Sequence, residues 1–71
     1  MTLDRMFQAL ADGTRRAMIE RLVRSPASVS DLAHPFDMTL PAVVQHLAVL
    51  EAAGIVTSQK IGRVRTVQLA P

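Results

Sequence analysis

The side chains best suited to chemistry lie in two clusters in the C-terminal half of the chain. The first cluster occupies segment 40–53, in which Gln45 offers an amide that both donates and accepts hydrogen bonds and Ala42 is small and apolar. No acidic residue lies between Asp37 and Glu51, so little in this segment would repel a phosphate. An amide suits adenine and a small apolar side chain suits the methyl group of thymine, which favours approach to a base-pair edge. The alternative is a helix packed against protein on both sides.

The second cluster is a group of cations in segment 55–69. Lys60, Arg63 and Arg65 surround Gly62, and the segment contains no Asp or Glu. Cations without neighbouring anions are what contact with phosphates requires. The alternative is an ordinary solvated turn, but the first cluster next to it favours phosphate contact.

The first cluster requires a helix to position it. Thr39 can cap such a helix through its hydroxyl, Pro41 suits the first turn because no N–H is needed there, and Gly54 suits the end. The helical repeat turns one set of residues inward, namely Leu40, Val43, Leu47 and Leu50. The opposite face would carry Pro41, Ala42, Gln45, Ala48, Val49 and Ala52.

The second cluster requires a β-hairpin. Segments 55–59 and 64–69 are rich in β-branched residues and predict two strands. Between them, the segment 60–63 contains Gly62, the residue type that a tight turn needs. Helix 40–53 followed by this basic hairpin is typical of a winged helix-turn-helix.

Two further helices are predicted at the N-terminal end. The first is an amphipathic helix indicated by the apolar spacing of Leu3, Met6, Phe7 and Leu10. Asp12 or Thr14 can cap the second, which runs to about Arg24. Its inward stripe would be Met18, Ile19, Leu22 and Val23. Arg15 and Arg16 lie on this helix, either as part of a solvated face or as phosphate contacts.

A short third helix completes the helix-turn-helix. Ser30 is predicted to cap a helix from Asp31 to about Phe36, with Asp31 favourably placed in the first turn. Segment 36–38 would form the turn before helix 40–53. The sequence therefore predicts one domain over residues 1–71, mainly α with a β-hairpin: a winged helix-turn-helix of about four helices and a two-stranded wing.

The composition excludes several classes of function. The chain of 71 residues has no cysteine, which excludes disulfides and thiolate metal sites within it. His34 and Asp37 are too few to form a metal site, so no metal or other cofactor is expected. No Ser/His/Asp set, carboxylate pair or phosphate loop can be assembled, so an enzyme is not expected. No apolar run approaches the ~18 residues of a membrane span, and we expect a cytoplasmic protein with no membrane partner.

The apolar content points to a partner subunit. Apolar residues make up 49% of the chain, and a core of this size rarely leaves more than about 3–5 kcal/mol of net stability. We expect a homodimer interface that includes Leu3, Met6, Phe7 and Leu10. The net charge is only +2, but all the cations except Lys60 are arginines, which bind phosphate bidentately.

Three stretches of the sequence resemble the ArsR-type winged-helix transcriptional repressors. They are ALADGTRRAMIERL, SVSDLAHPFDMTLPAVVQHLAVLEAAGIV and GRVRTVQL, and segment 46–56 is the most specific part. The resemblance covers nearly the whole chain. It implies a dimeric repressor that binds double-stranded DNA operators, with a recognition helix over 40–53 and a wing over 55–69. The DNA contacts that it implies are Thr39, Pro41, Ala42, Gln45 and His46 in the helix and Lys60, Arg63 and Arg65 in the wing.

The sequence departs from this family at several places. Ser28 and Ser30 stand where many members carry metal-sensing cysteines, so metal sensing at that segment is not expected. Val44 replaces a common serine of the recognition helix, and Gly13 replaces a common proline. The family usually continues past the wing into a further dimerisation helix, which this chain is expected to be without. His46 is expected to form a hydrogen bond that positions the recognition helix or reaches a phosphate.

Two functions remain open at this point. The first is a sequence-specific transcriptional regulator, a repressor, in which helix 40–53 reads the major groove and wing 55–69 contacts phosphates or the minor groove. The second is a winged-helix protein-interaction module without specific DNA binding. The neutral outer face of the helix and the acid-free hairpin favour the first.

Overall fold

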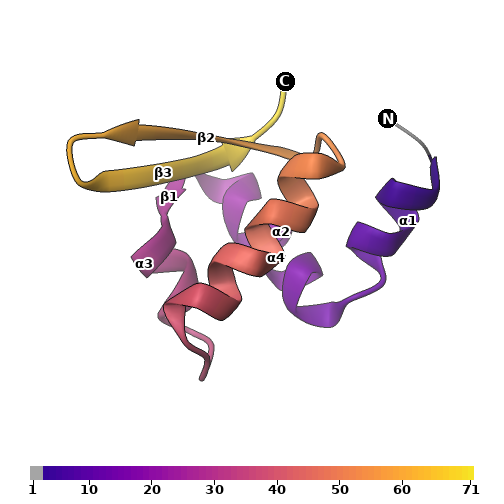
Figure 1. Cartoon of the computed structure of the whole chain (residues 1–71), viewed down its shortest axis with the longest axis horizontal. Coiled ribbons are helices and arrows are strands. Elements are labelled where there is room, and N and C mark those ends of the chain that lie inside the picture. The colour runs from indigo at the N-terminus through magenta and orange to yellow at the C-terminus, as the bar shows by residue number, and fades with distance from the viewer. Residues whose placement is uncertain (1–2) are drawn as a thin grey trace.

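Four helices and three strands make up residues 3–71, the part of the chain that the computed structural model describes. In chain order they are α1 (Leu3–Leu10), α2 (Gly13–Arg24), β1 (Ala27–Ser28), α3 (Val29–Ala33), α4 (Leu40–Ala52), β2 (Val56–Ile61) and β3 (Val64–Leu69). α4 packs against both α1 and β2, and the turn of the β2–β3 hairpin lies at the end of the molecule remote from α1 (Figure 1). This arrangement confirms the predicted winged helix-turn-helix.

Side-chain caps fix the starts of α2 and α4, as the sequence predicts. The Asp12 carboxylate accepts two backbone N–H groups of α2 at 2.8 and 3.1 Å, and the Thr39 hydroxyl accepts the N–H of Ala42 at 3.3 Å. These bonds satisfy donors that the first turn of a helix leaves unpaired. Gly54 follows α4 with a φ of 75°, the left-handed conformation that favours glycine after a helix.

The start of α3 differs from the prediction. Ser28, not Ser30, is the N-cap: its hydroxyl accepts the N–H of Asp31 at 3.0 Å, and the Asp31 carboxylate accepts the N–H of Ser28 at 3.4 Å. This reciprocal capping box satisfies two donors at once, which explains the earlier start. The helix also ends earlier than predicted, at Ala33, because Pro35 has no N–H to continue the hydrogen-bond ladder.

The sheet is antiparallel with the strand order β1-β3-β2. Ile61 pairs with Val64, which leaves a two-residue turn, and Gly62 with a φ of 62° takes the first central position, where type II′ turns place glycine. Lys60 and Ile61 therefore belong to β2 rather than to the predicted turn. The sequence does not predict β1, because a strand of 2 residues is too short to show an alternating pattern.

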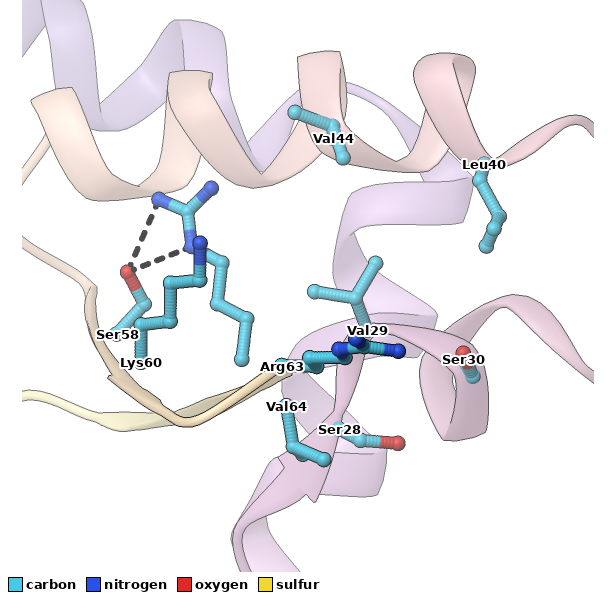
Figure 2. A pocket seen from close by; sticks show the side chains of 10 residues that line it. Ser28, Val29, Ser30, Leu40, Val44, Ser58, Lys60, Arg63 and Val64 are labelled. Atoms are coloured by element: carbon cyan, nitrogen blue, oxygen red, sulfur yellow. Dashed lines mark hydrogen bonds between the residues drawn. The ribbon is translucent and has the colours of Figure 1, made fainter.

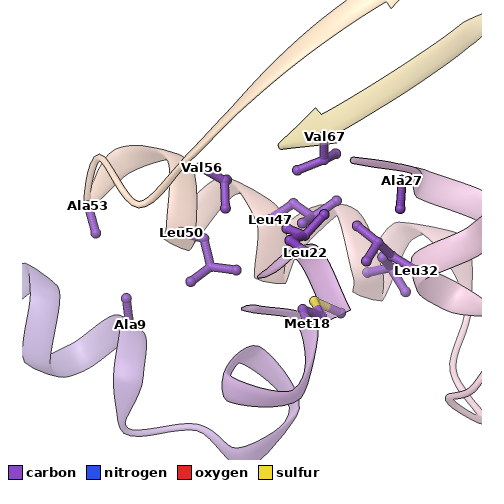
Figure 3. Packing of buried hydrophobic residues seen from close by; sticks show 11 residues of the cluster. Ala9, Met18, Leu22, Ala27, Leu32, Leu47, Leu50, Ala53, Val56 and Val67 are labelled. Carbon is purple, nitrogen blue, oxygen red and sulfur yellow. The ribbon is translucent and has the colours of Figure 1, made fainter. Parts of the chain in front are cut away.

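The core lies where α2, α3 and α4 meet one face of the sheet (Figure 3). Its largest fully buried side chains are Met18, Leu32, Leu50, Val43, Val56 and Val67. Two predicted core residues are wrong, since Val23 is 69% exposed and Leu40 is 50% exposed. Val23 lies about 100° further round α2 than Leu22 and so leaves the buried stripe, and Leu40 begins α4 at the edge of a groove. Val49, predicted to face outward, packs against the core.

α1 leaves most of its apolar stripe outside the core. Ala9 is fully buried and Met6 is half-buried, but Leu3 and Phe7 are 69% and 66% exposed and Leu10 is 38% exposed. Leu3 and Phe7 of the stripe that predicts this helix therefore contribute little to the core of their own chain. They stay available for contact with another molecule.

Candidate nucleic-acid interface

A groove of about 710 Å³ opens between α3, the N-terminal half of α4 and the β2–β3 hairpin (Figure 2). None of the residues that line it is acidic. They are Ser28, Val29, Ser30, Leu40, Val44, Ser58, Lys60, Arg63, Val64 and Arg65. Three segments distant in sequence thus form one surface of cations, hydroxyls and aliphatic groups, which suits a polyanion that also has apolar edges.

The exposed face of α4 borders this groove and carries no Asp, Glu, Lys or Arg before Glu51. Its exposed residues in these turns include Pro41, Val44, Gln45 and Ala48. Ala42 and His46, one turn apart on another side of the helix, are only half-buried. Gln45 is therefore the exposed polar side chain that α4 presents before Glu51, and Thr39 presents a hydroxyl at the helix start.

The cations of the hairpin differ in whether their side chains have partners within the protein. Lys60 and Arg63 are exposed, and within residues 3–71 neither side chain makes a hydrogen bond or an ion pair. Arg65 Nη2 lies 3.6 Å from Glu51 Oε2, and its Nε and Nη2 donate to Ser58 Oγ at 3.2 and 3.1 Å, the dashed lines of Figure 2. Lys60 and Arg63 are thus available to an anion, whereas Arg65 joins β3 to β2 and α4.

His46 contacts α2. Its Nδ1 lies 3.2 Å from Nη1 of Arg15, so this histidine has a hydrogen-bond partner on α2. Arg15 also donates from Nε to the carbonyl of Ala9 at 2.8 Å and from Nη2 to that of Gln8 at 2.9 Å, so it links the end of α1 to α4. The interpretation of Arg15 as part of a solvated face is therefore wrong, because its guanidinium is hydrogen-bonded to α1 and lies against His46 of α4.

Arg16 makes a similar contact with α1. Its Nη1 donates to the carbonyl of Leu10 at 2.6 Å. The last carbonyls of a helix have no partner within it, and a guanidinium is well suited to them through both its donors and its charge. Arg15 and Arg16, in the first turn of α2, therefore both donate hydrogen bonds to carbonyls at the C-terminal end of α1. The sequence does not predict these bonds, because the partners lie on another helix.

Asp12 belongs to the same junction. The backbone N–H of Arg15 is the main reason that the pKa of this carboxyl lies below its usual range, and the N–H of Thr14 and the guanidinium charge of Arg15 act in the same direction. A carboxylate at this position also complements the positive end of the α2 dipole. The junction of α1, α2 and α4 is thus held by an ionised cap and a multiply bonded arginine.

Within residues 3–71, no group of three or more His, Cys, Asp or Glu side chains lies close enough together to hold a metal ion. The pair His34 and Asp37 therefore has no third ligand of these types in the described chain. None of the described helices has the length and apolar character needed to cross a membrane.

Sequence comparisons identify related proteins. A helix-turn-helix domain family matches residues 10–59. The HTH-type transcriptional regulator Rv2034 of Mycobacterium tuberculosis is 50% identical over 68 residues, which cover 96% of this chain and 64% of that protein. The chain thus spans less than two thirds of the length of this relative.

Solved structures show the same architecture. The crystal structure of an ArsR family transcriptional regulator matches with a TM-score of 0.91 at 54% identity, over 94% of this chain and 69% of that chain. The solution structure of a homodimeric winged helix-turn-helix DNA-binding domain from Mycobacterium bovis matches with a TM-score of 0.90 at 25% identity, over 97% of this chain and 64% of that chain.

Proposed function

The chain belongs to the ArsR-type family of winged helix-turn-helix regulators, and from this premise we propose that it is a sequence-specific DNA-binding transcriptional repressor. One observation carries the proposal: the groove beside α4 has no acidic lining residue, and two of its cations, Lys60 and Arg63, have side chains without a hydrogen bond or ion pair in residues 3–71. A surface of this kind attracts the phosphates of duplex DNA and leaves a neutral helix face to approach the bases.

In this function α4 enters the major groove and the hairpin follows the backbone. Gln45 reads a base edge, for which its amide has the donor and acceptor that adenine requires. The other contacts proposed for α4 and its cap are Thr39, Pro41, Ala42 and His46. The Nδ1 of His46 is engaged by Arg15, which leaves its Nε2 for a phosphate. The contacts proposed for the wing are Lys60, Arg63 and Arg65.

We also propose that two copies bind together. The exposed apolar side chains of α1 support a two-fold interface that includes Leu3, Met6, Phe7 and Leu10, and the domain from Mycobacterium bovis is a homodimer. Two recognition helices then address two half-sites of an operator. A dimer bound at that operator would block transcription sterically, so the proposed function needs no catalytic residue. The protein would act in the cytoplasm, where the DNA lies.

Salt titration of duplex binding tests the proposal. With about six phosphate contacts in a dimer, the logarithm of the affinity should fall against the logarithm of the salt concentration with a slope of roughly −5. Fluorescence anisotropy with a labelled duplex selected from a randomised pool gives this slope directly. Affinity that barely changes between about 50 and 200 mM salt would instead support a protein-interaction module.

A further inference from the structure

Three aliphatic side chains line the groove without being covered by the protein. Leu40 and Val44 on α4 are 50% and 39% exposed, and Val64 on the hairpin is 54% exposed. Figure 2 shows Leu40 projecting from α4 toward α3, with Val44 further along the same helix. Phosphate contact does not account for them, because a phosphate offers nothing apolar to pack against.

Duplex DNA presents one prominent apolar group to a helix in its major groove. The C5-methyl group of thymine projects there, whereas the other bases present mainly hydrogen-bonding groups. Val44 neither donates nor accepts a hydrogen bond through its side chain, so it can distinguish bases only by apolar contact. It is exposed, lines the groove and lies one helical turn after Leu40, so both side chains lie on the same face of α4.

We propose that Val44 selects a thymine in the operator by packing against its C5-methyl group, with Leu40 beside it. The inference rests on the proposed function, because it names what the same surface reads. Val64 is less suited to this role, since it lies next to the turn of the hairpin, which is proposed to contact the sugar-phosphate backbone of the DNA rather than the bases. Burial of one methyl group corresponds to about a fourfold change in affinity, and two half-sites of a dimer give about 15-fold.

The decisive experiment removes this methyl group from the DNA. Duplexes are selected from a randomised pool with the full chain, and each thymine of the selected sequence is replaced in turn by deoxyuridine, which lacks only the C5-methyl group. We expect one symmetric pair of thymines at which the replacement weakens binding about 15-fold, while the other replacements leave the affinity nearly unchanged. This arm uses the unaltered protein and does not depend on the folding of a variant.

A variant assigns the effect to the side chain. Val44→Ala should weaken binding to the thymine duplex by a similar factor and should no longer respond to deoxyuridine at that pair of positions. Val23→Ala is the matched control, because Val23 is an exposed valine on α2 that does not line the groove. This control should keep the full response.

The outcomes separate the inference from the proposed function. A wild-type chain that binds its selected duplex tightly but tolerates deoxyuridine at every position overturns the inference and leaves the proposed function in place. Full sensitivity to deoxyuridine in Val44→Ala overturns the inference in the same way. A chain that enriches no sequence and binds duplexes without salt dependence overturns both.

Discussion

Arg63 and Arg65 carry the same charge, yet the structure predicts that they contribute differently to DNA binding. Arg63 occupies the turn of the hairpin, and its side chain makes no hydrogen bond or ion pair within the described residues. Arg65 is already paired with Glu51 at 3.6 Å and hydrogen-bonded to Ser58. We therefore expect Arg63 to neutralise a phosphate fully and Arg65 to do so only in part.

The expected size of the difference follows from counterion release. Each neutralised phosphate contributes about 0.9 to the salt slope, so Arg63→Ala should reduce the slope of a dimer by about 1.8, equally on selected and scrambled duplexes. Arg65→Ala should reduce it by less than half as much. The ion pair joins two half-exposed side chains and is worth about 0–1 kcal/mol, so Glu51→Gln should release Arg65 and raise affinity up to about fivefold per subunit.

Anisotropy titrations of the three variants between about 50 and 200 mM salt measure these slopes. Arg24→Ala is the control, because it removes an exposed arginine that does not line the groove and should leave the slope unchanged. Equal slopes for Arg63→Ala and Arg65→Ala would refute the reasoning, as would a loss of affinity in Glu51→Gln. Selective loss of sequence preference in Arg63→Ala would show that the wing reads bases.

Further predictions concern specificity, assembly and pH. Gln45→Ala should cost about 1–3 kcal/mol on the selected duplex and relax the preference at one base pair, which titrations on single-base variants will show; an unchanged preference would contradict the role of this amide. Phe7→Glu should place a charge in the proposed dimer interface and shift sedimentation toward the monomer across a concentration series, whereas an unchanged distribution would exclude this face. The folded-state pKa of Asp12 is lowered, so its contribution to stability is present above the unfolded pKa of about 3.9 and is lost as the pH falls through the folded value. Thermal melts should show a weaker acid dependence in Asp12→Asn, and an identical dependence would count against the cap.

The sequence predicts those parts of the fold whose causes are local. Thr39, Pro41 and Gly54 mark the two ends of α4, and the position of Gly62 marks the turn of the hairpin. Their effects act within a few residues of the chain, where spacing can be read directly. The start of α3 was open to error because Ser28 and Ser30 are both good caps, and the choice between them depends on which one forms a reciprocal pair with an acid three residues later.

The parts that escape prediction are contacts between elements distant in the sequence. Arg15 reads as an ordinary helix-surface cation, and only the packing of α2 against both α1 and α4 brings its guanidinium to the carbonyls of Gln8 and Ala9 and to His46. The ion pair of Arg65 with Glu51 likewise depends on how the hairpin packs against α4, which the sequence does not show. The intramolecular partners of these arginines are thus decided by packing rather than by residue type.

These two arginines join α4 to different elements of the fold. Arg15 joins it to α1, which carries the exposed apolar face, and Arg65 joins its C-terminal end to the hairpin. In the proposed dimer, the two recognition helices must lie about one DNA turn apart, and that spacing is set by how each α4 is oriented relative to its own α1. The hydrogen bond between Arg15 and His46 therefore acts on the geometry of both half-sites together, although neither residue needs to touch a base for this effect.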